Sequence, residues 1–337
     1  MRPHAALLRR VRQLLCGVAG LAALTARSAT PAAATPPPPA PRVGTIPTVL
    51  GEASGLAASR RADNLLWAHN DSGGEPVLFA LDTKGALRGK LRIEGVKNTD
   101  WEDIASFELD GRAWLLVADT GDNDGKRKDC ALLVVAEPDS AELKPDKELT
   151  ATVAWRVPVR WPGGPRDCEA IAVDAREGKV YLLTKRTVPA ELYTLPLRPA
   201  DGSAFALPSL AFPPRAAPAA APEAVLVARL AQILQPTPEQ KLLPLPTGKY
   251  RAEPTALDFA PDGSAAVVLT YGDTWLFHRT PGQSWADALA AKGEKLAPHG
   301  LLQGEAAGFS RDGRAIFVTG ELPGASLVRY ELPAGKP

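Results

Sequence analysis

The sequence is poor in the residues that build metal and nucleophile sites of several common kinds. It has three cysteines and four histidines in 337 residues, and they form no spaced His/Cys set, which argues against zinc. It has no Gly-x-Ser-x-Gly motif, which disfavours a serine hydrolase. The formal net charge is only +1, so no excess of one sign points to a nucleic acid or an anionic membrane as a partner.

Long apolar runs are also scarce. The run Leu14–Leu24 follows Arg9, Arg10 and Arg12 and precedes small residues, which is the layout of a signal peptide, and it is too short to span a bilayer. We therefore expect a signal peptide over residues 1–28, no integral membrane segment in the mature chain, and a secreted or periplasmic protein. Residues 29–42 are rich in Pro and Ala and predict an extended linker, which leaves residues 43–337 as a single domain.

Removal of the leader takes Cys16 with it and leaves Cys130 and Cys168. In an oxidising compartment two cysteines can pair. Spacing does not decide between a disulfide and two separate buried thiols, because the geometry of a disulfide is specific.

Five segments share one pattern, which is an acidic residue, a short apolar strand, a tight turn and a second apolar strand. In four of them the strand begins at a glutamate, and in the other it begins at Thr255. The five strand starts are Glu52–Leu56, Glu102–Ala105, Glu169–Val173, Thr255–Phe259 and Glu305–Phe309. The turns after them are Arg61–Asn64, Asp110–Gly111, Glu177–Gly178, Asp262–Gly263 and Asp312–Gly313, and such residues supply the positive φ that tight hairpins need.

Second and third strands follow each turn, so each repeat predicts a small antiparallel sheet. Repeats of this size and kind are typical of β-propeller blades, which bury their faces against one another around an axis. We expect an all-β propeller with four-stranded antiparallel blades. The strand at Val43–Leu50 precedes the first repeat and is predicted to complete the last blade and close the ring.

The number of blades depends on the long interval between the third and fourth repeats. It contains the Pro-rich segment Pro213–Pro222 and the apolar segment Ala224–Leu234. One fourth strand with surface insertions gives five blades, and a degenerate extra blade gives six. A second insertion, Ser284–Lys292, has capping-box spacing between Ser284 and Asp287 and predicts a short helix.

Because consecutive strands of a blade run in opposite directions, the repeated acidic strand starts and the turns between second and third strands lie at the same end of the propeller. This predicts a carboxylate-rich channel mouth, where converging like charges need a cation or raised pKa values. A structural role, in which the glutamates bond to amides of neighbouring strands, is the alternative. The residues expected to bind a ligand are Glu52, His69, Asp71, Trp101, Glu102, Asp119, Glu169, Lys185, Tyr271 and Glu305.

A divalent cation, with calcium as the candidate, suits an oxygen-only ligand set in an exported protein. The candidate metal ligands are Glu52, Glu102, Asp122, Asp124, Glu169 and Glu305. The segment Asp119–Gly125 resembles a calcium loop in composition but lacks the glutamate of an EF-hand. An Asp-rich turn held by its own side chains is the other interpretation.

Candidates for catalysis are Glu102, Asp103 and His69. Glu102 and Asp103 are adjacent, so alternation predicts that one of the two side chains points into the contact between blades. His69 is more typical of a packing or turn residue than of a base.

Several of these motifs resemble a family of exported bacterial propeller proteins without an established activity. They are Asn98–Ala105, Asp119–Asn123, Arg166–Ala170 and Gly304–Ala306. More distantly, the chain is similar to phytase-like esterase propellers and to gluconolactonase-like propellers. In the latter a Gly-Glu pair holds a divalent metal on the axis, and Gly51-Glu52 and Gly304-Glu305 match that fragment, but the other ligands have no clear counterparts here.

Two functions remain open on the sequence. In the first, the acidic mouth binds a small-molecule, glycan or peptide ligand together with a divalent cation, and the protein is expected to be monomeric. The alternative is a metal-dependent hydrolase of phosphate esters, esters or lactones, in which a carboxylate activates water.

Overall fold

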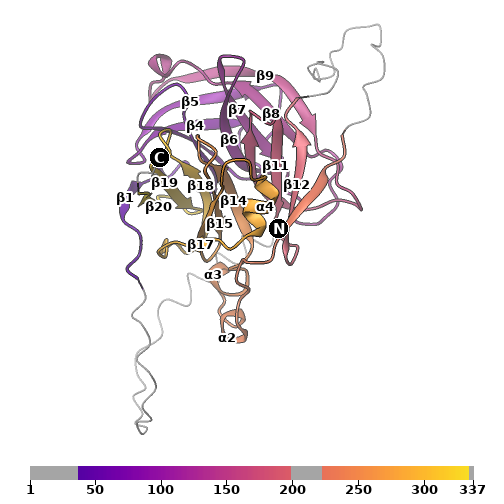
Figure 1. The fold of residues 1–337 in the computed structure, drawn as a ribbon. Helices are drawn as coiled ribbons and strands as arrows, with labels where there is room; N and C mark the ends of the chain where they lie inside the picture. Colours follow the sequence, from indigo (N-terminus) through magenta and orange to yellow (C-terminus); the bar gives the residue numbers. More distant parts are fainter. Residues whose placement is uncertain (1–36, 199–221, 334–337) are drawn as a thin grey trace, which may run out of the picture. The chain divides into compact units, whose positions relative to one another are not determined.

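A computed structural model describes residues 37–198 and 222–333 of the chain. The predicted signal peptide, most of the predicted linker and the Pro-rich residues 213–221 lie outside the described residues. The described part is mostly β-strand, with a few short helices between the strands (Figure 1).

Three of the sheets have four antiparallel strands each. One sheet contains β10 (Cys168–Asp174), β11 (Lys179–Thr184), β12 (Ala190–Pro196) and β13 (Val225–Leu230). Another contains β14 (Pro254–Phe259), β15 (Ala265–Thr270), β16 (Thr274–His278) and β17 (Glu294–Lys295). The third contains β18 (Gly304–Phe309), β19 (Ala315–Gly320), β20 (Ser326–Glu331) and β1 (Arg42–Thr45).

The remaining sheet has eight strands and consists of two antiparallel halves. One half contains β2 (Ala53–Ala58), β3 (Leu65–Asn70), β4 (Val77–Asp82) and β5 (Leu87–Glu94). The other contains β6 (Trp101–Leu109), β7 (Arg112–Asp119), β8 (Ala131–Ala136) and β9 (Glu148–Pro158). The halves are joined by parallel pairing of β5 with β9, so the outermost strands of two repeats have merged.

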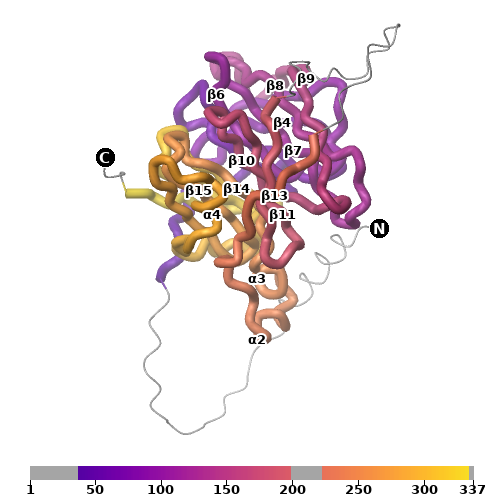
Figure 2. Tube along the Cα trace, turned by 45° about the vertical axis from the view of Figure 1, so that its right-hand side comes forward, coloured from indigo at the N-terminus to yellow at the C-terminus, as the bar shows by residue number. Residues whose placement is uncertain are grey.

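The first strand of each four-stranded group lies next to the first strand of the next group. β2 contacts β6, β6 contacts β10, β10 contacts β14, β14 contacts β18, and β18 contacts β2. In Figure 2 the colour along the tube changes in sequence order from one sheet to the next. A cycle of inner strands with antiparallel sheets around it is the arrangement of a β-propeller, as the repeats predicted.

The N-terminal strand pairs with the last strand of the chain. β1 is antiparallel to β20, with Gly44 opposite Leu327 and Thr45 opposite Ser326. The prediction that a strand before the first repeat completes the last sheet is therefore confirmed. The strand is shorter than Val43–Leu50, because the chain turns at Pro47, whose carbonyl accepts a hydrogen bond from Leu50 N.

The predicted hairpin turns have the backbone conformation that their residues favour. Asn64 and Asp110 have φ of 56° and 52°, although neither is glycine. Gly178, Gly263 and Gly313 have φ of 63°, 76° and 70°. All of these turns connect the first and second strands of their sheets.

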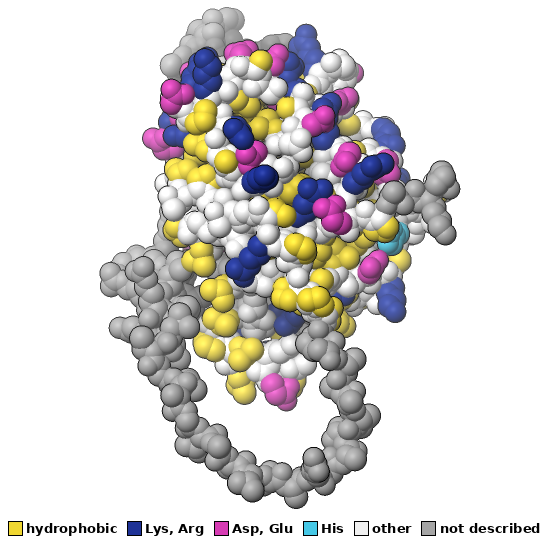
Figure 3. Space-filling view, turned by 90° about the vertical axis from the view of Figure 1, so that its left-hand side faces the viewer, with side chains coloured by type: hydrophobic (Ala, Val, Ile, Leu, Met, Phe, Trp, Pro, Cys, Tyr) yellow, Lys and Arg dark blue, Asp and Glu magenta, His cyan; other side chains and the backbone are white. Residues whose placement is uncertain are grey.

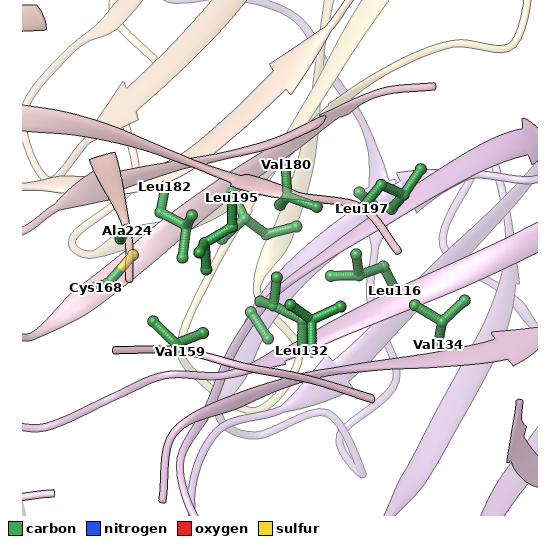
Figure 4. Close-up of a cluster of buried hydrophobic side chains, with 14 of the residues drawn as sticks. Leu116, Leu132, Val134, Val159, Cys168, Val180, Leu182, Leu195, Leu197 and Ala224 are labelled. Atoms are coloured by element: carbon green, nitrogen blue, oxygen red, sulfur yellow. The ribbon is translucent and has the colours of Figure 1, made fainter. Parts of the chain in front are cut away.

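Apolar side chains fill the spaces between neighbouring sheets. Between the sheets of β7 and β11, Leu116 and Leu132 face Val180 and Leu195 (Figure 4). Cys130 and Cys168 belong to the same cluster, and both are free and buried. Of the two alternatives for these cysteines, the structure has two separate thiols.

The predicted helix near Ser284 is α4 (Trp285–Ala290), and the Ser284 side chain accepts a hydrogen bond from Asp287 N as its cap. Trp285 from this helix is fully buried and stacks on Phe259, with ring centroids 3.6 Å apart. The sequence did not predict α2 (Pro238–Lys241), α3 (Pro246–Lys249) or the 3-10 turn η1 (Ser140–Glu142). All three are one turn long, too short for a periodic pattern.

Among the described residues there is no helix of the length and apolarity needed to cross a membrane. Over the face drawn in Figure 3, basic and acidic side chains are interspersed, in line with the nearly balanced composition.

Candidate functional site

The glutamates that begin the inner strands converge at one end of the ring. Glu102, Glu169 and Glu305 are 3%, 4% and 7% exposed, which is unusual for carboxylates. Glu52 begins the first repeat but is exposed. The glutamates on β6, β10 and β18 are thus part of a buried group, whereas Glu52 lies at its edge.

Glu102 belongs to two carboxylate triads. It forms one with Asp71 and Asp100 and the other with Asp167 and Glu169, and in each triad one oxygen from every residue lies within 4.8 Å of the others. Asp71 follows β3, while Asp100 and Asp167 immediately precede β6 and β10. We call these five residues the carboxylate cluster.

The loop after β7 holds this cluster in place. Gly121 N donates to Asp100 O over 3.1 Å, and Asp122 N donates to Asp167 Oδ1 over 2.9 Å. A Cβ at Gly121 would lie 2.7 Å from Asp100 Cγ and would also collide with Glu102 Oε1. Only glycine leaves space for both carboxylates here.

The acidic residues of this loop have partners within the loop. Asp122 accepts hydrogen bonds from the backbone of Lys126 and Arg127, and Asp119 binds the Arg127 guanidinium at 2.7 Å. Asp124 is exposed and lies 3.6 Å from Lys126 Nζ. This favours the Asp-rich turn, and the assignment of Asp122 and Asp124 as metal ligands stays a prediction.

Lys185 is the one lysine that enters this group of buried acids in the described part of the chain. It comes from the turn after β11, is 4% exposed and forms a short ion pair with Glu169. Its Nζ also lies 4.9 Å from the centroid of the Tyr271 ring. Burial lowers the pKa of Lys185, but Glu169, Tyr271 and Glu305 outweigh burial and raise it well above its ordinary value, so the ammonium is charged.

The carboxyl groups have raised pKa values because they are buried beside one another. Burial, followed by the charges of Glu169 and Asp71, raises the pKa of Glu102 well above its ordinary value. Burial and Asp100 raise the pKa of Asp71 to about 7. Burial and Glu305 raise that of Glu321, at the edge of the group, to about 8. The group contains more carboxylate charge than Lys185 can balance.

Other side chains hold the inner strands together. Asp103, which is fully buried, accepts hydrogen bonds from Ile104 N, Ile171 N and Leu257 N, on β6, β10 and β14. Asp258 links β14 to β18 through Phe259 N and Phe309 N. These are the bonds to neighbouring strand amides that the alternative interpretation assigned to the repeated glutamates.

Asp103 therefore points into the contact between strands, and its neighbour Glu102 points into the cluster, as alternation predicted for one of the pair. Among the described residues, the Glu102 carboxylate accepts a hydrogen bond from Ser54 Oγ alone, over 3.3 Å. The Ser54 hydroxyl also donates to the Glu102 carbonyl over 2.7 Å. The Glu102 carboxylate therefore accepts fewer hydrogen bonds than that of its neighbour Asp103.

His69 packs beneath the site. It is fully buried, its ring lies edge-on to Trp101 with centroids 5.8 Å apart, and Nδ1 is 3.0 Å from Asn70 O. Burial lowers the pKa of His69 to about 4. Trp101 is fully buried as well, so neither ring faces the opening.

A cavity of about 360 Å³ adjoins the Lys185 side of the cluster. The basic residues among its lining are Lys185, Arg186, Lys241 and Lys249. The one-turn helices α2 and α3 contribute the last two. Arg186 also binds Asp167 of the cluster at 2.7 Å, so the cavity and the carboxylates share an edge.

Sequence reasoning identified Glu102, Glu169, Glu305, Asp71, Lys185 and Tyr271 as members of one site, and the structure brings them together. It did not select Asp100 or Asp167 as ligands. Their signal was present, since each directly precedes an inner strand. The cavity-lining residues on α2 and α3 belong to no repeat, so the repeat pattern did not identify them.

A cation fits the carboxylate cluster. All donors are carboxylate oxygens, which hard cations such as calcium prefer, and Gly121 leaves the space beside Glu102 and Asp100 free of a side chain. Lys185 is directed to Glu169, which leaves Asp71, Asp100 and Glu102 as the triad without an ammonium partner among the described residues.

No protein-family model matches the chain, and no curated protein sequence matches it. Among solved structures, a gluconolactonase from Xanthomonas campestris is similar, with 12% identity and a TM-score of 0.42, covering 87% of this chain and 88% of that one. A candidate 6-phosphogluconolactonase from Bacteroides uniformis has 15% identity and a TM-score of 0.35, covering 84% and 68%. U3-55K has 11% identity and a TM-score of 0.37, covering 83% and 68%. None of these likenesses assigns a function to this chain.

Proposed function

We propose that the chain is an exported five-bladed propeller that binds a divalent cation, calcium, in the carboxylate cluster, together with an anionic ligand. The observation that carries the proposal is the pair of carboxylate triads that share the buried Glu102. Buried carboxylates that converge without a matching cation repel one another, and their raised pKa values are the consequence.

The blade count in this proposal rests on the five inner strands that contact each other in a cycle. The long interval between β12 and β14 provides β13 and the helices α2 and α3, which leaves no further four-stranded sheet among the described residues. Export is proposed from the leader at residues 1–28.

The ligand's chemistry follows from the neighbouring cavity. A cation held by Asp71, Asp100 and Glu102 would attract oxygen donors, and Lys185, Arg186, Lys241 and Lys249 line the adjoining space. A ligand with phosphate or carboxylate oxygens would satisfy both parts. Acidic sugars and phosphorylated small molecules are the class of ligand that we propose.

Calorimetric titration of the mature protein with calcium tests the cation site. We expect saturable binding that Glu102→Gln weakens by about tenfold or more, because it removes a charge common to both triads. Asp124→Asn is the matched control, since Asp124 is an exposed acid of the neighbouring loop. Loss of binding in Asp124→Asn with retention in Glu102→Gln would instead place the ion in the loop.

A metal-dependent hydrolase is the second candidate. One observation favours it over simple binding, namely the raised pKa of a carboxyl group in the cluster. Asp71, with a pKa of about 7, can accept or donate a proton near neutral pH. In this case a cation held by the other carboxylates of the cluster would polarise a phosphate, ester or lactone oxygen, while Asp71, not bound to the cation, would move the proton.

Turnover assays with calcium separate the two candidates. 4-Nitrophenyl phosphate, 4-nitrophenyl acetate and gluconolactone represent the three substrate classes. Calcium-dependent turnover that Asp71→Asn abolishes while calcium binding persists would support the hydrolase. Calcium binding without turnover of any of the three would support the binding protein.

A further inference from the structure

The inner strands have a second end, opposite the carboxylate cluster, and it surrounds a cavity of about 310 Å³. Every inner strand reaches it through its final residues or the turn that follows. The lining includes Arg60 after β2, Phe107 on β6, Asp174 on β10, Phe259 on β14 and Arg311 after β18. The cavity is therefore on the axis of the ring.

Three arginines from three different turns line this cavity, namely Arg60, Arg176 and Arg311. Arg60 is half-buried, and its Nε donates to the Ser106 carbonyl and hydroxyl, both over 3.0 Å. These bonds fix the side chain by one edge. Its two terminal nitrogens have no hydrogen-bond partner among the described residues, so the guanidinium keeps donors for a ligand.

In the described part of the chain, none of the acids around the cavity forms an ion pair with Arg60. Asp174 accepts hydrogen bonds from Trp285 Nε1 over 2.8 Å and from Arg279 Nη1 over 3.4 Å. Asp258, whose charge acts on Arg60, uses its oxygens for Phe259 N and Phe309 N. Glu108, the other acid of the lining, is exposed.

Arg176 and Arg311 are held less tightly. Arg176 Nη2 donates to Pro261 O over 3.2 Å, and Arg311 Nη1 binds Asp63 at 3.0 Å, where the Asp63 side chain is 83% exposed. An exposed ion pair of this kind contributes little and can be exchanged for a better acceptor. Two aromatic rings, Phe107 and Phe259, give the cavity an apolar wall beside these donors.

We infer that this opposite mouth is a second binding site, for a small organic oxyanion whose carboxylate or phosphate is held by Arg60, Arg176 and Arg311 and whose body lies against Phe107 and Phe259. Planar guanidinium groups bind such oxyanions through two parallel hydrogen bonds. The site is independent of the cation site, because the two lie at opposite ends of the inner strands.

Binding of phenyl phosphate and benzoate, titrated separately at constant ionic strength in EDTA, tests this inference. EDTA prevents capture of the anion by a cation in the carboxylate cluster. We expect saturable binding of at least one probe, weakened by about tenfold or more in Arg60→Gln and in the Arg176→Gln/Arg311→Gln double variant. Binding of phenyl phosphate alone would identify a phosphate site, and binding of benzoate alone would identify a carboxylate site. Binding of both probes would identify a general oxyanion site.

Arg61→Gln is the matched control. Arg61 adjoins Arg60 and pairs with Asp139 at 3.0 Å, but it does not line the cavity. The affinity of the Arg61→Gln variant for the probes should stay within about twofold of that of the parent protein. Absence of saturable binding of both probes, or equal affinity in the parent and the double variant, would overturn the inference. Because the double variant changes exposed side chains, it remains informative if Arg60→Gln fails to fold.

Glu102→Gln distinguishes the two proposals. It should weaken calcium binding by about tenfold or more and leave binding of the probes in EDTA unchanged. Failure of the anion site would leave the calcium result standing, and failure of the calcium site would leave the anion result standing.

Discussion

Lys185 and Glu169 form an ion pair in which the two side chains are only 4% and 5% exposed. Glu102 adjoins this pair but has no cation of its own among the described residues. Lys185 neutralises Glu169 and Arg186 pairs with Asp167, which leaves Asp71, Asp100 and Glu102 without an ion-pair partner among the described residues. These three carboxyl groups either take up protons or bind a cation, and the predictions below follow from this choice.

The unfolding free energy of the metal-free protein should fall as pH rises from about 7.5 to 8.5. Asp71 and Glu321 have folded-state pKa values of about 7 and 8, far above those of an unfolded chain. In this window the folded state binds more protons than the unfolded state, so stability decreases with pH. Each such proton contributes a slope of up to about 1.4 kcal/mol per pH unit.

The pH window starts above the range in which the histidines change their protonation state. Burial lowers the pKa of His69 and of His299 to about 4, so these residues add stability as pH rises through about 6.5 and oppose the carboxyl groups there. Above about 7.5 both are almost entirely neutral in the folded and unfolded states. Urea unfolding in EDTA at several pH values measures the slope, and a flat or rising profile between about 7.5 and 8.5 would contradict the prediction.

Calcium binding at pH 7 should release protons. A carboxyl must be deprotonated to act as a ligand. Burial raises the pKa of Asp71 to about 7 and that of Glu102 well above its ordinary value. We expect about one proton or more per ion, with affinity increasing as pH rises. Calorimetry in buffers of different ionisation enthalpy measures the release. Equal heats in all buffers would mean that the ion binds carboxylates that are already ionised.

Replacement of Gly121 by alanine should weaken calcium binding by about tenfold or more, because the new methyl group would occupy the space beside Glu102 and Asp100. Gly74→Ala is the control. Gly74 is exposed, and its nearest neighbour to an added Cβ is Asn98 Nδ2 at 3.9 Å. Similar affinities in both variants would show that the ion lies away from Gly121.

Much of the fold could be predicted because the repeats constrain it. The predicted strand starts Glu169–Val173 and Glu305–Phe309 lie within β10 and β18. The merged strands β5 and β9 were not, because their pairing is parallel and lies between repeats. Local patterns do not encode which edges of two sheets meet.

The site was predictable to the extent that repeats place equivalent residues at one end of a ring. Glu102 and Glu169 occupy equivalent positions, and so their convergence followed from topology alone. The burial of Glu102 did not, since it depends on Gly121 and the loop packed over it. The separate fates of Glu102 and Asp103 followed from alternation, but the three strands that Asp103 links could be identified only in the folded chain.

Asp103→Ala should lower the unfolding free energy by about 3 kcal/mol or more and leave calcium affinity of the folded protein within about twofold. The substitution would leave three backbone N–H groups, those of Ile104, Ile171 and Leu257, without an acceptor in the core. Each unpaired buried donor costs about 1–3 kcal/mol. Chemical unfolding gives the stability, and calorimetry on the folded variant gives the affinity.

Glu102→Ala is the natural comparison, because Glu102 and Asp103 are adjacent and both nearly inaccessible, yet they face different surroundings. Here the metal-free protein should lose little stability, since repulsion from Glu169 and Asp71 is removed along with the single bond from Ser54, while calcium affinity should fall by about tenfold or more. If Asp103→Ala lost affinity or turnover without losing stability, Asp103 would belong to the site as a candidate base, and the division of roles between these two neighbours would be reversed.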